Sequence, residues 1–209
     1  MNKCKIKTIG FMILVLLLLS LSLFIIKRVI FFFVERTDFS DYMASMVSMI
    51  ILTSIILRLS RKAEINLSIF PDKFTVSYIS VSIISVVLFI ASPSNYKGGI
   101  EPILLLVYSS IVTPIFEELI FRGYIWNELN QIFTSEWKTY IITTILFALW
   151  HLGYISSIAF RVEDDLLNVM IWKVITGLCF GIALGAVRLK TKNCYSTMIL
   201  HGVMNLFGR

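Results

Sequence analysis

The sequence predicts an all-α fold, a polytopic transmembrane helical bundle of about seven to eight helices. Of the 209 residues, 57% are hydrophobic and only 15% are charged, whereas soluble domains have about 45–50% apolar and about 25% charged residues. The mean hydropathy of +0.85 agrees with this excess. Apolar stretches near 20 residues recur along the chain, and about 20 helical residues cross a hydrocarbon core of about 30 Å. No linker or low-complexity segment divides the chain, so residues 1–209 are expected to form a single integral membrane domain.

The first predicted span follows a basic N-terminus, MNKCKIK. Its apolar run exceeds the roughly 7–15 residues of a signal peptide and has no A-x-A-like cleavage site, which predicts an uncleaved span. The segment IFFFV at 30–34 is either a continuation of this span or a separate interfacial segment, so the total is seven or eight. The predicted spans are 9–26, 42–59, 74–92, 103–121, 139–160, 168–187 and a shorter one at 195–207.

The basic residues predict the orientation of the bundle, because cytoplasmic loops of membrane proteins are enriched in Lys and Arg. A cytoplasmic N-terminus puts most of them on that side, and the segment RVEDD at 161–165 on the other side is acidic. Glu117 would then lie within about two turns of the cytoplasmic face. Lys27 and Arg28 argue against this orientation. The residues predicted to be cytoplasmic are Lys3, Lys5, Lys7, Arg58, Arg61, Lys62, Lys73, Arg122, Lys138, Arg188, Lys190 and Lys192; the others are Lys27, Arg28, Arg36, Lys97, Arg161 and Arg209.

The net charge of +6 does not indicate a nucleic-acid partner. The basic residues lie mainly between apolar runs instead of forming a stripe, so the expected partner is the lipid bilayer.

The three cysteines include no CxxC pair and predict neither a disulfide framework nor a zinc knuckle. In the sixth span, Gly177, Gly181 and Gly185 are spaced by four and predict close helix packing on one face.

An acidic pair interrupts the fourth span, in the stretch TPIFEELIFRGY. A charge near the middle of a bilayer costs about 2.5–3.5 kcal/mol. Residues four apart share a helix face, so Glu118 and Arg122 are expected to form an ion pair. Glu117 points about 140° away from Arg122 and is left without that partner. Pro114, one turn earlier, frees a backbone carbonyl and can bend the helix.

The two histidines of the chain, His151 and His201, both fall in apolar spans. His201 and Asn205 are four apart and share a face. A carboxylate, two imidazoles and an amide are suited to activating water and stabilising an oxyanion. Glu117, His151 and His201 also suit a divalent metal such as zinc, so the sequence leaves both a metal and a metal-free site open.

The same polar residues can also have purely structural roles. Glu118 and Arg122 can be an ion pair that only holds the fold together. A membrane histidine can simply hydrogen-bond to a neighbouring helix, and intramembrane His and Glu can also mark a proton path. The aromatic residues Phe147, Trp150 and Tyr154 are interpreted as packing or interfacial side chains.

Three motifs carry a family resemblance. EELIFR at 117–122 fits the pattern EExxxR, FALWH at 147–151 fits FxxxH, and HGVMN at 201–205 fits HxxxN. Their order, and their placement in three separate spans, resembles the CPBP intramembrane proteases. That family includes the type II CAAX prenyl endopeptidases and the Abi-type bacteriocin self-immunity proteins. The resemblance covers a catalytic core at about 103–208.

The resemblance implies an intramembrane endopeptidase that hydrolyses a peptide bond near the cytoplasmic membrane face. Glu117 and His151 would polarise the attacking water, and His201 and Asn205 would steady the tetrahedral oxyanion. Peptide or membrane-protein substrates are implied, for CAAX-type, pheromone or bacteriocin-related processing. The compact chain resembles prokaryotic members, which places it in a prokaryotic cell membrane. Glu118 and Arg122 would support the site structurally.

Two other functions fit the same residues. The first is a non-catalytic bacteriocin self-immunity or membrane scaffold protein, in which the polar groups are structural. The second is a proton-coupled carrier, although the chain shows no internal repeat of the inverted kind common in carriers. The substrate, the metal and the oligomeric state are left open by the sequence.

Overall fold

The computed structural model describes residues 3–91 and 98–207, with side chains from residue 7 onward. The described residues form helices and connecting segments without a β-strand. The predicted positions of residues 92 and 208, and of Lys97 and Arg209, lie outside this part of the chain. The helices are α1 (Lys3–Phe33), α2 (Asp38–Lys62), α3 (Val76–Ala91), α4 (Ile100–Val107), α5 (Thr113–Glu118), α6 (Trp126–Ile132), α7 (Glu136–Trp150), α8 (Ile155–Arg161), α9 (Leu166–Thr191) and α10 (Cys194–Phe207).

Five helical segments are long and apolar enough to cross a membrane, which confirms the predicted membrane bundle. Helices α3 and α10 are shorter. The aromatic segment at 30–34 continues the first span, because α1 runs without a break to Phe33. Of the two alternatives for this segment, continuation is therefore correct. The five segments are Lys7–Phe33, Asp38–Lys62, Ile100–Ile132, Glu136–Arg161 and Leu166–Thr191.

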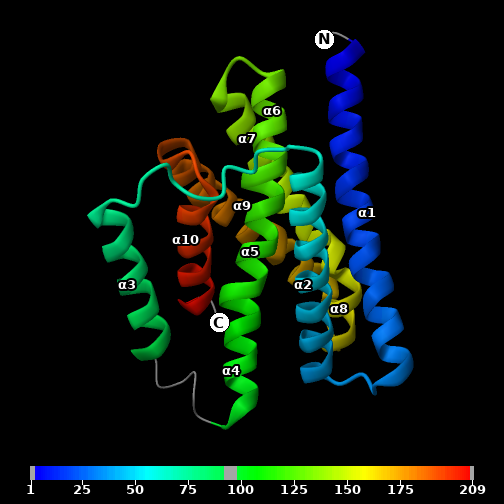
Figure 1. Ribbon diagram of the computed structural model, residues 1–209. Helices are drawn as coiled ribbons and strands as arrows, with labels where there is room; N and C mark the ends of the chain where they lie inside the picture. Colours follow the sequence, from blue (N-terminus) through cyan, green and yellow to red (C-terminus); the bar gives the residue numbers. More distant parts are fainter. Residues whose placement is uncertain (1–2, 92–97, 208–209) are drawn as a thin grey trace.

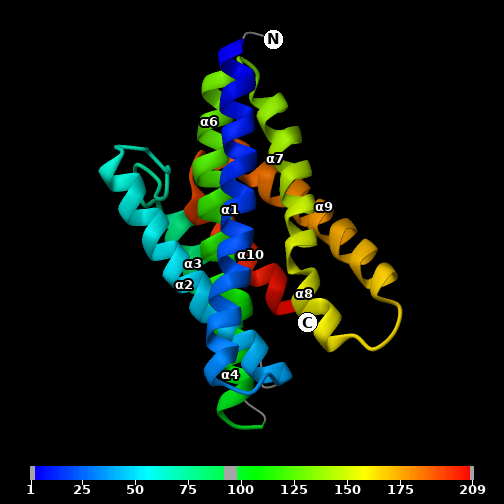
Figure 2. The same ribbon diagram turned by 90° about the vertical axis from the view of Figure 1, so that its right-hand side faces the viewer.

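The helices run between two ends of the bundle (Figure 1). The N-terminal end carries the start of α1 and the connections from α2 to α3 and from α6 to α7. The opposite end, called here the distal end, carries the connections from α1 to α2 and from α8 to α9 (Figures 1 and 2). Three of the basic residues used to predict orientation are buried and act as internal groups instead of loop charges. These are Lys27, Arg122 and Arg188.

The central segment Ile100–Ile132 is longer than the predicted span 103–121. It continues 15 residues, about four helical turns, beyond Glu117. The helix therefore extends farther past Glu117 than the predicted end at residue 121, while the expected depth of Glu117 below the cytoplasmic face stays a prediction. Two π-helical turns, at Tyr108–Val112 and Leu119–Ile125, interrupt the segment on either side of the acidic pair. Pro114 follows the first of them and lacks a backbone N–H, which explains a local break in the α-helical hydrogen bonding there.

The predicted glycine face of α9 packs closely against α7. A Cβ atom at Gly181 would lie 3.0 Å from Thr144 Cγ2, and one at Gly185 would lie 2.4 Å from Tyr140 Cε2. Glycine is needed at both positions because the neighbouring helix leaves no room for a side chain. This contact fixes α7, and with it the segment that carries His151.

Candidate active site

Glu118 and Arg122 form the predicted ion pair in the interior of the bundle. Arg122 Nη1 donates to Glu118 Oε1 at 2.9 Å, and both residues are buried. The guanidinium also lies over the Phe147 ring, 4.3 Å from its centroid, and Nη2 donates to the Gly181 carbonyl at 3.4 Å. The charges are therefore compensated by each other and by groups on α7 and α9.

Glu118 also holds His201. The Nδ1 atom of His201 lies 3.0 Å from Glu118 Oε1. Because the carboxylate is paired with Arg122, it acts as the acceptor and Nδ1 carries the proton. The ring is thereby oriented with Nε2 toward Glu117, 3.9 Å from Oε2. Glu118 thus fixes the direction of a histidine from the last described helix.

Glu117 points away from this pair, as the helix geometry predicts. Its side chain is 2% exposed and makes no contact with Arg122 that resembles the one made by Glu118. Oε1 accepts a hydrogen bond of 2.7 Å from the Tyr154 hydroxyl. Since the tyrosine occupies Oε1, Oε2 is the oxygen that faces His201.

The interpretation of Tyr154 as a packing or interfacial side chain is wrong. Its hydroxyl donates to Glu117 and accepts from Trp150 Nε1 at 2.8 Å. Tyr154 follows His151 by three residues, in the 3₁₀ turn His151–Tyr154 that joins α7 to α8. That spacing was the available signal, because residues three apart in such a turn lie on the same side.

His151 lies at the start of this turn and faces the same cavity as Glu117. Its Nδ1 donates to the Phe147 carbonyl at 2.9 Å, since a carbonyl can only accept, and Nε2 is left for another partner. His151 and Glu117, both among the described side chains, share the cavity without a direct hydrogen bond. The predicted partnership of the two groups therefore requires a bridging water or substrate.

Gly177 leaves the space that His151 occupies. A Cβ atom at this position would lie 2.7 Å from His151 Nδ1. We expect Gly177→Ala to displace the imidazole and to lower kcat/KM about 100-fold, as misplacement of a reacting group by about 1 Å does. Gly10→Ala is the control, because a Cβ there meets nothing within 4 Å. Wild-type activity in Gly177→Ala would show that the position of His151 is unimportant.

Asn205 lies on the same face of α10 as His201, as predicted, and lines the cavity with it. One N–H of its amide donates to the Ser109 carbonyl at 2.7 Å. Ser109 belongs to the first π-helical turn, so this turn supplies the acceptor that fixes the amide. The second N–H of the amide remains available to a ligand.

A cavity of about 580 Å³ joins these groups. Its lining residues come from α2, the central segment, the 3₁₀ turn His151–Tyr154, α8, α9 and α10. Glu117, His151, Tyr154, His201 and Asn205 line it together, and the lining residues Tyr42, Arg161 and Lys173, near ends of α2, α8 and α9, are called here its outer part. All four residues predicted to be catalytic are thus brought to one cavity by three segments distant in sequence.

The three residues considered as metal ligands do not form a ligand set. Within residues 3–91 and 98–207, no group of three His, Cys, Asp or Glu side chains is arranged to hold a metal ion. Glu117 Oε2 and His201 Nε2, the atoms left free by Tyr154 and Glu118, lie 3.9 Å apart, and His151 adds no third ligand at a shared position. The donor geometry therefore does not fit a zinc site of Glu117, His151 and His201.

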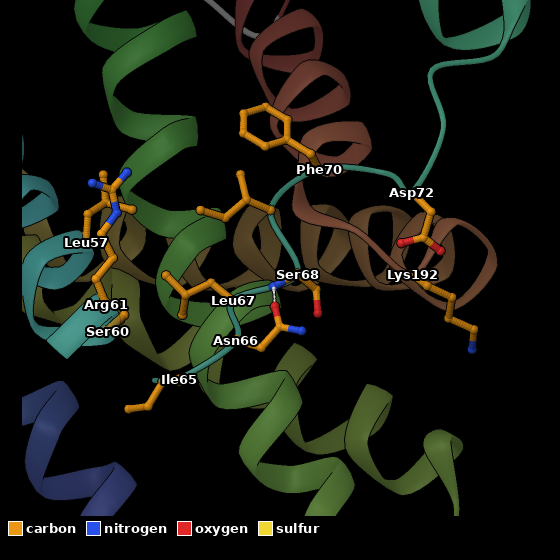
Figure 3. A pocket seen from close by; sticks show the side chains of 11 residues that line it. Leu57, Ser60, Arg61, Ile65, Asn66, Leu67, Ser68, Phe70, Asp72 and Lys192 are labelled. Atoms are coloured by element: carbon orange, nitrogen blue, oxygen red, sulfur yellow. Dashed lines mark hydrogen bonds between the residues drawn. The ribbon is translucent and has the colours of Figure 1, made fainter. Parts of the chain in front are cut away.

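The position of α10 is fixed at the N-terminal end by the chain that follows α2. The backbone N–H groups of Cys194 and Tyr195 donate to the carbonyls of Ser68 and Ile69 at 2.9 and 2.8 Å. Beside this contact lies a second pocket of about 410 Å³ (Figure 3). Asn66 stabilises its wall by accepting a 2.8 Å hydrogen bond from the Ser68 N–H, drawn as a dashed line in Figure 3. The second pocket shares no lining residue with the cavity around Glu117.

Comparison with known proteins identifies the family. A model of the type II CAAX prenyl endopeptidase Rce1-like family matches residues 99–207, more than half of the chain. The chain belongs to this family. The Rce1-like region begins at the start of α4 and contains all three motifs and the whole central segment. The resemblance predicted from the motifs is therefore confirmed.

A curated relative extends the comparison. The chain is 30% identical over 135 residues to UPF0177 protein YxdF of Lactococcus lactis subsp. lactis (strain IL1403). The match covers 64% of this chain, and the chain spans 64% of the length of that relative. No solved structure matches the chain. Together with the five apolar spans, membership of the Rce1-like family identifies an integral membrane protein of an endopeptidase family.

Proposed function

We propose that this Rce1-like chain is an intramembrane endopeptidase that hydrolyses peptide bonds with a water activated by Glu117 and His151. One observation carries the proposal. A buried glutamate, with one oxygen held by Tyr154 and the other free, faces a half-buried cavity that also contains two histidines and an amide. A carboxylate that has no compensating cation of its own in an apolar bundle is costly and is typical of a functional group.

Glu117 is suited to act as general base. A water between Glu117 Oε2 and His151 Nε2 gives one proton to the carboxylate while its oxygen attacks the peptide carbonyl. A C–O bond forms, and the carbonyl oxygen takes the electron pair as an oxyanion. Glu117 then gives the same proton to the leaving nitrogen as the C–N bond breaks. The step balances without a metal ion.

His201 and Asn205 are suited to bind the oxyanion. Both side chains face the same cavity as Glu117. A His201 ring that carries protons on both nitrogens would donate Nε2–H to the oxyanion, together with the free N–H of Asn205. Glu118 contributes by holding Nδ1, so it is a positioning residue.

Tyr154 is the second positioning residue. We expect Tyr154→Phe, which removes only the hydroxyl, to lower kcat by about 10- to 100-fold and to leave KM nearly unchanged. The reason is that Glu117 loses the donor that directs Oε1 away from the water. Steady-state kinetics of the purified protein measure both constants. Tyr140→Phe is the matched control, because its hydroxyl donates to the Ile182 carbonyl outside the cavity. Equal kcat for Tyr154→Phe and wild type would remove Tyr154 from the mechanism.

The direction of the cavity affects the predicted side of cleavage. Two residues of the cavity lining belong to helix ends at the distal end: Tyr42 follows the start of α2 at Asp38, and Arg161 is the last residue of α8. We propose that substrate enters past these residues, which with a cytoplasmic N-terminus is the side opposite to the predicted cytoplasmic face of cleavage. We retain the cytoplasmic N-terminus. Lys27, one of the two residues that argue against this orientation, is buried in an ion pair with Asp41 and is therefore not a loop charge. Substrate then reaches Glu117 from the non-cytoplasmic side.

Cysteine labelling tests this orientation. After Cys4, Cys179 and Cys194 are replaced by Ala, Thr176→Cys in the cavity lining is expected to react with a membrane-impermeant maleimide in intact cells. Lys190→Cys, near the other end of α9, is the control and should react only in inverted vesicles. The reverse pattern would show that the distal end is cytoplasmic.

A comparison of membrane peptidomes tests the proposed activity. Cells that express wild type should release peptides that are absent from cells expressing Glu117→Gln at the same level. The identity of those peptides decides between CAAX-type, pheromone and bacteriocin-related processing. Identical peptidomes, together with retained protection from a bacteriocin in both strains, would instead support a non-catalytic immunity protein of the same fold.

A further inference from the structure

The outer part of the active-site cavity is cationic. Two basic residues line it, Arg161 from α8 and Lys173 from α9. Glu117, at the inner end, is the one carboxylate among the described lining residues. The acidic residues at 163–165 follow Arg161 in the chain but do not line the cavity. The proposed mechanism uses neither of the two cations.

Arg161 belongs to a cluster with excess positive charge. The Asp41 carboxylate is fully buried and contacts three cations: Lys27 at 3.0 Å, Arg36 at 2.8 Å and Arg161 at 2.8 Å. One carboxylate cannot neutralise three cations, so the cluster retains a charge of +2. The Arg161 guanidinium is further held over the Tyr42 ring, 4.2 Å from its centroid. Arg161 is therefore a preorganised cation in a cluster whose single carboxylate is shared by three cations.

Lys173 has no partner of its own. Among the described side chains it makes no hydrogen bond or ion pair, although it lies in the apolar span Leu166–Thr191. Its ammonium is within electrostatic reach of Arg161 and Glu117. A lysine within a membrane helix costs about 2.5–3.5 kcal/mol unless it faces water or a counter-ion. Its place in the cavity lining supplies the water, and Glu117 is the one carboxylate among the described residues of the same lining. Within the described part of the chain, Lys173 has no hydrogen-bonded acceptor, so its ammonium can bind one from a ligand.

We propose that Arg161 and Lys173 form a subsite for a carboxylate carried by the peptide substrate. This inference rests on the proposed function and adds a substrate specificity to it. Lys173 lies one helical turn from Gly177, which contacts His151, so it is about 6 Å from the level of His151 along the axis. Arg161 lies ten residues, about 15 Å, beyond His151. At about 3.3 Å per extended residue, the carboxylate belongs two to four residues from the scissile bond.

The test uses the full chain in phosphatidylcholine nanodiscs and a set of fluorogenic peptides built on a cleaved sequence from the peptidome. Each peptide carries one Asp or the matching Asn at a scanned position, with a free or an amidated C-terminus. We expect wild type to prefer Asp over Asn by about tenfold in kcat/KM at two to four residues from the cleaved bond, as a hydrogen bond to a charged group would give. Lys173→Gln should abolish the preference, and Lys173→Glu should invert it.

The controls separate this inference from the proposed activity. Lys190→Gln changes the same residue type on the same helix outside the cavity and should keep the preference. A preference that survives amidation assigns the carboxylate to a side chain, and one lost on amidation assigns it to the C-terminus. An unchanged Asp-to-Asn ratio in Lys173→Gln overturns the subsite while leaving the protease intact.

Binding provides a readout that does not need turnover. In the Glu117→Gln background, fluorescence anisotropy should give an approximately tenfold lower Kd for the Asp peptide than for the Asn peptide, and Lys173→Gln should remove the difference. Equal Kd values overturn the subsite even if no peptide is cleaved. An effect of Lys173→Gln that appears only in nanodiscs containing phosphatidylglycerol would assign the site to a lipid headgroup, and the peptide subsite would be wrong.

Discussion

Glu117→Gln is expected to lower kcat by at least about 1,000-fold, with membrane insertion and thermal stability unchanged. The amide keeps the shape of the side chain and can still accept from the Tyr154 hydroxyl, but it cannot take a proton from water, and loss of a general base costs about 10²–10⁴ in rate. Stopped assays on a peptide from the peptidome measure the effect.

Glu101→Gln is the matched control, because Glu101 is an exposed carboxylate near the start of the same helical segment and lies outside the cavity. Its activity should equal that of wild type. Full activity in Glu117→Gln would end the hydrolytic mechanism, and transport of a solute driven by a pH gradient in liposomes would then favour the carrier.

Arg122→Met is expected to have the largest effect on stability. It leaves Glu118 as a fully buried charge without its cation, and breaking a buried pair in this way costs about 3–5 kcal/mol. We expect a large drop in the temperature of unfolding in detergent and a low yield of folded protein. Lys192→Met, which breaks an exposed pair with Glu136, should change stability by less than about 1 kcal/mol.

The double variant Arg122→Met with Glu118→Leu separates stability from activity. Apolar replacement of both partners of a buried ion pair is often neutral, so much of the lost stability should return. Activity should stay low, because His201 has lost the acceptor at Nδ1. Recovery of both properties would show that Glu118 has no positioning role.

The fold could be predicted from the sequence because lipid imposes simple requirements. Apolar length alone located all the spans, and the four-residue spacing gave the Glu118–Arg122 pair and the glycine face of α9. Helix ends were less predictable. Beyond residue 121 the central segment contains polar as well as apolar residues. Its last 11 residues were therefore not predicted to belong to a span.

Helical periodicity could not predict that the three segments carrying the site residues meet at one cavity. Helical spacing shows which residues share a face, but it does not show which faces meet, and the motif resemblance supplied that information. Tyr154 was missed because a tyrosine near a membrane boundary is usually interfacial, and Asp41 because two of its three cations, Lys27 and Arg161, lie on other helices. The direction of the cavity depends on how α8 and α9 pack, which no local pattern records.

The attachment of α10 to residues 68 and 69 has a consequence for synthesis. The ribosome delivers α10 only after the five apolar spans, and the two backbone hydrogen bonds at Cys194 and Tyr195 can form only then. His201 and Asn205 both lie on α10. Under the proposed mechanism, a nascent chain that has inserted Glu117 and His151 but not α10 lacks both groups proposed to bind the oxyanion, and it is therefore expected to be inactive.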